Sequence, residues 1–396
     1  MNPRLHSLKS GVATLFAACL FGTAPAVATP VRVTITSLAP ANGVYTTPFW
    51  VAFHDGSFDL FDMGAPASPE LERVAEDGNT MPITGAFGAA DPAGQDATIT
   101  EPSGFPGLPV FDPGNSATQV FDVDPGTQGF FTFASMVVPS NDAFIGNDSP
   151  EAYPVFNDDG SVRSFDIVVN GDQVRDAGTE VNTETDAAFL NQTAPDTGET
   201  EGGVITQHPG FNGSVGNPDG MPMNILGGTN PAGIFFDPVA ADFTREGAQI
   251  VRIHIGPAID TSFSGSWYDP ARSGEGIQVD LYPYQGGTGG VVTFYTYSPD
   301  GTAQAWIQGV GTVENDTLTV DDAYLTSGGT FGDMFDPAAV TRTSWGTMQI
   351  QFNSCSDAEF SYASTLPEYG SGMHDYTRLT PVQGSGACTD QSATTR

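Results

Sequence analysis

Lysine is almost absent from this chain of 396 residues, in which it occurs once, at Lys9. Lysine and arginine together number 12 against 47 acidic residues, so the formal net charge is −35. Such a chain has no basic stripe and repels phosphate groups, which argues against nucleic-acid binding. Only 15% of residues are charged. This low share excludes coiled coils and helical bundles, which need sequences rich in Ala, Glu, Lys, Leu and Arg.

Long apolar runs are also missing. The run at residues 12–22 is too short for a bilayer, which takes ~20 residues, and no later segment reaches that length without charges. A charged start precedes this run, and the small residues 26–28 follow it. This layout predicts a secretory signal peptide over residues 1–28, cleaved after Ala28. Lipoprotein acylation at Cys19 is a competing interpretation, but residues 16–18 match its cleavage pattern poorly.

Export fits the remaining composition. Cleavage after Ala28 would remove two basic residues and no acid, changing the formal charge from −35 to −37. Only Cys355 and Cys388 would remain of the three cysteines. An even pair in an oxidising compartment most simply forms one disulfide. A metal-binding or catalytic thiol is the other interpretation, but it lacks a CxxC spacing or a histidine placed close in sequence. We therefore expect a secreted, periplasmic or cell-surface protein without a transmembrane segment.

Glycine and proline are abundant, at 48 and 30 residues, and they separate short apolar stretches. Apolar and polar residues alternate with a period of two in several of these stretches, which indicates strands with one buried face. Examples are residues 31–35, 130–138, 164–169 and 249–255. The sequence therefore predicts an all-β protein, and its length fits two domains.

Local signals refine this organisation. Ser68 followed by Pro69 predicts the start of one short helix, which Gly78 ends. Residues 182–231 show little periodicity, and a loop of this length is usually functional or tied down by an ion or by packing. Strand character breaks at residues 256–261. We therefore expect one β domain over residues 29–258 and a second over residues 262–396.

Four stretches of the first domain together resemble the spondin N-terminal domain family in its bacterial branch. They are residues 47–59 (TPFWVAFHDGSFD), 71–80 (LERVAEDGNT), 134–146 (ASMVVPSNDAFIG) and 176–180 (DAGTE). Their order and spacing fit over roughly residues 30–256. The resemblance implies an antiparallel β-sandwich similar to a C2 domain, found in secreted matrix and adhesion proteins that are not enzymes.

The resemblance also implies a calcium site at Asp142, Asp176 and Glu180. The last position is usually Asp in animal members, and Glu reaches one methylene further, so coordination can shift. Calcium prefers six to eight oxygen ligands, and Gly178 allows a tight loop that aims Asp176 and Glu180 inward. Acid pairs are nevertheless common in surface loops, so the spacing by itself leaves metal binding open. The cysteines that brace animal members are absent from this stretch.

Other polar clusters are weaker candidates. Asp55, Asp59 and Asp62 with His54 could form a second cation site, although a capped turn is the favoured interpretation. His254 alternates within a strand and fits a structural role, whereas His208 in the long loop has no nameable catalytic partner. The chain lacks GxSxG, P-loop, GxGxxG and HExxH motifs.

The second domain resembles a module appended to many secreted bacterial proteins, for which no function is assigned. Its strands predict a small antiparallel sandwich or barrel. Its aromatic residues are expected to be core fillers or cross-strand pairs, with a sugar-stacking platform or surface attachment as further possibilities. These residues are Trp267, Tyr295, Tyr297, Trp306 and Trp345.

These features together predict a secreted, non-enzymatic, calcium-binding protein for adhesion or interaction. Its partners would be the calcium ion and an extracellular protein or glycan. A secreted hydrolase of a polymer, with the second domain as a carbohydrate-binding module, is the second hypothesis. A purely structural envelope protein is the third.

Overall fold

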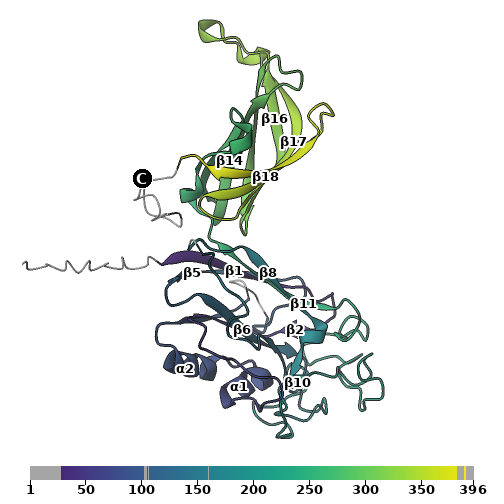
Figure 1. Ribbon diagram of the computed structural model, residues 1–396. Helices are drawn as coiled ribbons and strands as arrows, with labels where there is room; N and C mark the ends of the chain where they lie inside the picture. The colour runs from purple at the N-terminus through teal and green to yellow at the C-terminus, as the bar shows by residue number, and fades with distance from the viewer. Residues whose placement is uncertain (1–27, 102–104, 106, 159, 381–387, 389–396) are drawn as a thin grey trace, which may run out of the picture.

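The computed structural model describes residues 28–101, 105, 107–158, 160–380 and 388 (Figure 1). The predicted signal peptide and Cys19 lie outside the described residues, except for Ala28. Within this part of the chain, no helix is both long enough and apolar enough to cross a membrane. Strands dominate and all of their pairings are antiparallel, so the all-β prediction is confirmed.

The first part of the chain forms two facing sheets, as the sandwich prediction requires. One sheet has the order β5-β1-β11-β8, and the other has the order β10-β9-β7-β6-β3-β4, with β2 pairing with β6. The strands are β1 Thr29–Ser37, β2 Tyr45–Thr46, β3 Phe49–His54, β4 Gln95–Ile99, β5 Ser116–Val123, β6 Phe130–Val138, β7 Ala143–Gly146, β8 Phe165–Asn170, β9 Arg175–Asp176, β10 Thr206–Gln207 and β11 Gln249–Pro257.

Strand β3 is buried on both faces, which explains its unbroken apolar sequence. Phe49 and Phe53 point into the core between the two sheets. Trp50 points the other way, into a second core under the helices α1 Pro69–Asp77 and α2 Met81–Ala90. In Figure 1 both helices cover the outer side of this sheet. The domain therefore has three layers: sheet, sheet and helices.

Helix α1 begins and ends where its sequence predicts. The Ser68 side chain accepts a hydrogen bond from the Leu71 N–H at 3.2 Å, and Gly78 closes the helix in the left-handed region at φ 64°. A Cβ at Gly78 would lie 2.6 Å from the Thr47 side chain. Both the positive φ and this close approach therefore require glycine at residue 78.

Helix α2 was not predicted. Its sequence contains Gly85 and Gly88, which weaken helical propensity. Ile83 and Phe87 are buried in the core under the helices, and the Phe87 ring packs 5.6 Å from that of Trp50. Tertiary packing therefore overrides the local preference in this segment.

The second part of the chain forms a closed barrel, so the structure selects the barrel over the sandwich. Strands β12 to β19 pair in sequence order, and β12 also pairs with β19. They are β12 Gly265–Tyr268, β13 Gly276–Tyr284, β14 Gly287–Tyr297, β15 Gln304–Glu314, β16 Thr317–Ser327, β17 Thr341–Phe352, β18 Asp357–Ser364 and β19 Ser371–Arg378. Aromatic and aliphatic side chains fill its interior, as in other small barrels.

The expectation of core fillers or cross-strand pairs holds for four of the five barrel aromatics, since two are in the core and Tyr295 and Trp306 are an aromatic cross-strand pair; Tyr297 is neither in the core nor part of such a pair. Trp267 and Trp345 are buried inside, but Tyr295, Tyr297 and Trp306 are 44%, 48% and 63% exposed. Alternation along a strand separates two faces without saying which one is inside. Ala305 and Ile307, on either side of Trp306 in β15, take the inward positions instead, together with Phe294 in β14.

The two parts of the chain touch through one buried carboxylate. Asp316, in the turn between β15 and β16, accepts a hydrogen bond from the Ser164 hydroxyl beside β8. The His254 Nε2 atom lies 3.6 Å from the same carboxylate, and its Nδ1 atom lies 2.8 Å from Asp166. His254 thus has the structural role that its strand position favoured.

The cysteine pair is a disulfide. Cys355 is bonded to Cys388 across 33 positions, and Cys388 is buried against the barrel core. The bond therefore fixes a point of the C-terminal segment to the second domain.

Loss of this disulfide should destabilise the barrel. Closing a loop of this length restricts the unfolded chain by about 3 to 4 kcal/mol. We expect the double variant Cys355→Ser, Cys388→Ser to lose about that free energy of unfolding in urea titrations monitored by circular dichroism. Dithiothreitol should produce the same loss in the wild type and none in the double variant. Equal stability of the oxidised and reduced wild type would contradict the prediction.

Candidate metal centre

Three acidic side chains predicted to bind calcium lie at one end of the sandwich. Asp142 precedes β7, Asp176 ends β9, and Glu180 follows four residues later. Pairing of β7 with β9 sets Ala143 opposite Asp176, so Asp142 lies beside that strand. All three residues are buried, with exposed fractions of 0%, 7% and 3%. The structure thus brings the three loop positions together inside the protein.

The Asp142 carboxylate has two different oxygens. Its Oδ2 atom accepts hydrogen bonds from the backbone N–H groups of Thr179 and Glu180, at 2.9 and 3.1 Å. Its Oδ1 atom is buried and has no hydrogen-bond partner among the described residues. A buried carboxylate oxygen without a partner is costly. One oxygen therefore shapes the loop, and the other is available to a ligand.

The other two carboxylates are already hydrogen-bonded. Asp176 accepts from the Gly178 N–H at 2.8 Å and from the Asn182 amide at 2.5 Å. Glu180 accepts from the Gly198 N–H at 2.9 Å. The ligand oxygens of Asp142, Asp176 and Glu180 do not all lie within 4.8 Å of one another.

The three acids nevertheless share one negative field. Burial raises the pKa of Asp142 to about 7, and the neighbouring charge of Asp176 adds to the rise. Burial also raises the pKa of Glu180, with a contribution from the charge of Asp142. A cation would relieve this repulsion. The unpartnered Asp142 oxygen and the adjacent Asp176 would be the first ligands of a cation, whereas Glu180 would have to exchange its contact with Gly198.

A fourth buried acid, Glu184, organises the long loop and was not singled out from the sequence. Its carboxylate accepts backbone N–H groups of Asn212, Asn224 and Ile225, at 2.6, 2.7 and 3.0 Å. Burial raises its pKa, against the effect of these bonds. Glu184 therefore binds segments of the loop that lie 28 to 41 positions further along the chain. Its φ of 55° is unusual for glutamate, but this is visible only in the structure, so no sequence signal marked Glu184.

A second acidic group lies between helix α1 and the long loop. Glu72, Glu76 and Asp196 bring oxygens within 4.8 Å of one another. Arg73 offsets part of the negative charge of this group, because it pairs with Glu76 at 3.0 Å and with Asp196 at 3.3 Å. It also pairs with Asp77. This cluster therefore has a partial counterion within the chain.

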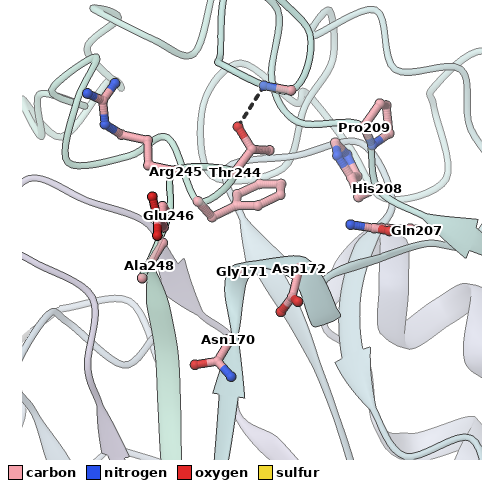
Figure 2. A pocket seen from close by; sticks show the side chains of 13 residues that line it. Asn170, Gly171, Asp172, Gln207, His208, Pro209, Thr244, Arg245, Glu246 and Ala248 are labelled. Carbon is pink, nitrogen blue, oxygen red and sulfur yellow. Dashed lines mark hydrogen bonds between the residues drawn. The ribbon is translucent and has the colours of Figure 1, made fainter.

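His208 is buried beside a polar cleft of about 760 Å³. Figure 2 shows Arg245 and Glu246 on one side of this cleft and Gln207 and His208 on the other. The His208 Nδ1 atom accepts the Gly210 N–H at 3.0 Å, and burial lowers its pKa to about 4. Its ring packs edge-on against Phe243. These contacts give His208 a structural role as a neutral residue.

The residues after His54 form a capped turn. This was the interpretation that the sequence favoured, with a second cation site as the alternative. Asp55 accepts the Ser57 N–H at 2.9 Å. The His54 ring is fully buried and accepts the Gly56 N–H at 3.1 Å. Asp55 and His54 are thus occupied in shaping the chain after β3.

Replacement of Glu184 should loosen the long loop. Glu184→Gln puts an N–H group where an oxygen accepts backbone N–H groups, so at least one of the three bonds is lost. We expect about 2 kcal/mol less free energy of unfolding, measured by urea denaturation. The control Glu199→Gln, at an exposed site nearby, should change it by less than about 0.5 kcal/mol. Equal stabilities of the two variants would show that Glu184 does not tie the loop.

Comparison with known proteins supports the resemblance seen in the sequence. The family model described as Spondin_N matches residues 40–154. The match includes three of the four stretches that carry the resemblance and contains Asp142, whereas Asp176 and Glu180 lie beyond it. No curated protein matches this chain. Residues 40–154 of the first domain are therefore similar to the spondin N-terminal domain family.

Proposed function

We propose that this protein is a secreted, non-enzymatic, calcium-binding module for adhesion or interaction outside the cell. Similarity of residues 40–154 to the spondin family supports an extracellular adhesion-type protein, and this family is in general non-enzymatic. The disulfide fits an oxidising compartment. The acidic composition, with a formal charge of −35, fits a protein that stays soluble there.

One observation carries the calcium assignment. The Asp142 Oδ1 atom is buried without a hydrogen-bond partner among the described residues, beside the charge of Asp176. Asp142 and Asp176 would supply the first ligands, and Glu180 would complete the set on leaving Gly198. Calcium would offset the negative charge of these buried acids. Its ligation by Asp176 and Glu180 would in turn fix the loop between them.

The expected affinity is modest. Extracellular modules bind calcium with dissociation constants of about 10⁻⁴ to 10⁻³ M, which suffices where free calcium is abundant. Such a site would make the surrounding loops more rigid, because the ion binds only their folded conformation. The adhesive surface would then be the set of loops around the ion.

Calcium should stabilise the protein, and this can be measured directly. At ten times a millimolar dissociation constant, the added free energy of unfolding is about 1.4 kcal/mol. Differential scanning calorimetry in EDTA and in calcium should therefore show a melting temperature higher by a few degrees in calcium. Isothermal titration calorimetry should report binding of one ion.

The variants Asp142→Asn and Asp176→Asn should abolish the shift. Asparagine at residue 142 keeps an oxygen for the N–H groups of Thr179 and Glu180, so the loop should still form. Asp219→Asn, at an exposed site of the long loop, is the matched control and should respond as the wild type does. An unchanged calcium response in Asp142→Asn would overturn the proposed site.

A further inference from the structure

One face of the barrel carries exposed aromatic rings from three neighbouring strands. Trp306 of β15 is 63% exposed, Tyr295 and Tyr297 of β14 are 44% and 48% exposed, and Tyr324 of β16 is 38% exposed. Soluble proteins rarely leave such rings together in water unless the surface binds a partner. We call this surface the aromatic face. It comprises Thr293, Tyr295, Tyr297, Gln304, Trp306, Gln308, Val310, Tyr324 and Thr326.

The rings are held in place by the sheet. Trp306 is the cross-strand partner of Tyr295, and their ring centroids lie 6.0 Å apart. Tyr324 is the partner of Gln308, one pleat away from Trp306. The Tyr324 hydroxyl donates to Asp322, and the Ser344 hydroxyl donates to the other oxygen of that carboxylate at 2.8 Å. The face is therefore preorganised, which lowers the entropy lost on binding.

Between the rings, the face offers uncharged hydrogen-bonding groups. Gln308 donates its amide to Thr293 at 3.1 Å, and Gln304 and Thr326 are exposed beside Trp306. None of the nine residues of the face is charged, but two charged residues border it, because Asp322 accepts from the Tyr324 hydroxyl and Arg342 is the cross-strand partner of Thr326. The centre of the face therefore offers amide and hydroxyl groups, which suit a neutral partner, and these charges lie at one edge.

We propose that the aromatic face binds a neutral, β-linked polysaccharide. Sugars whose hydroxyl groups are equatorial present only C–H groups on their ring faces, and these stack on the negative π-faces of aromatic rings. Their equatorial hydroxyls meet amide and hydroxyl groups such as those of Gln304, Gln308 and Thr326. The aromatic face lies on the outer wall of the barrel and extends over three strands, which suits a chain of such sugars better than a single sugar, which needs a concave pocket.

A lipid surface fits this region less well. The loop after β16 carries the exposed apolar residues Phe331, Met334 and Phe335. The acids Asp333 and Asp336 interrupt them. Anionic lipid headgroups would repel these acids and the net charge of −35.

The test uses the full chain and amorphous cellulose, with insoluble xylan as a second neutral β-linked probe. The wild type should sediment with at least one of them. The variant Trp306→Ala should bind at least about tenfold more weakly, as expected for a central aromatic anchor. The matched control is Tyr284→Ala, an aromatic residue with 43% exposure on the hairpin between β13 and β14. It should bind as the wild type does.

Tryptophan fluorescence gives a second readout with soluble hydroxyethyl cellulose. Trp50, Trp267 and Trp345 are at most 1% exposed, so acrylamide quenches mainly Trp306. Bound polysaccharide should protect the wild type from quenching and leave Trp306→Ala unchanged. Circular dichroism and melting temperature should be the same for all variants, because both replaced side chains are exposed.

Any of these binding results would overturn the proposal: no binding of the wild type to either polysaccharide, equal binding by Trp306→Ala, or binding instead to phosphatidylcholine vesicles. Light scattering would detect a second copy of the chain on this face, and a dimer abolished by Trp306→Ala would also overturn it. Binding should persist in EDTA, so this result is independent of the calcium site. Failure of one proposal would leave the other standing.

Discussion

Buried carboxylates that accept backbone N–H groups hold the irregular half of the first domain in shape. Asp142 binds the N–H groups of Thr179 and Glu180, and Glu184 binds three more from Asn212, Asn224 and Ile225. These loops have few ladder hydrogen bonds of their own, so charged acceptors take over that role. Hydrogen bonds to charged groups are stronger than those between neutral groups.

This arrangement has an electrostatic cost, which connects stability to function. The charge of Asp176 adds to the raised pKa of Asp142, and that of Asp142 adds to the raised pKa of Glu180, and the chain contains few basic residues to balance them. Arg73 offsets part of the charge of the cluster at helix α1. The group around Asp142 has no comparable ion pair among the described residues. In the proposed function, a divalent cation from outside would compensate this charge.

The sequence predicted the parts of the fold that local chemistry decides. Ser68, Pro69 and Gly78 delimit helix α1, and alternation locates strands such as β1 and β11. Strand β6 was also expected to have one buried face, but it is buried on both. Helix α2 escaped because packing of Phe87 outweighs its glycines. The role of Glu184 escaped too, because its partners lie 28 to 41 positions away and no local pattern marks them. Strand alternation likewise placed Trp306 opposite its neighbours in β15 without saying which side faces water.

The contact at Asp316 has a mechanical consequence. Ser164 and His254 meet this carboxylate from the first domain, so the barrel is braced by side chains as well as by its connecting chain. A brace of this kind makes the relative orientation of the two domains part of the folded state. A polymeric partner bound to one domain would then lose little further rotational freedom on binding the other. Two weak contacts would act as one strong attachment.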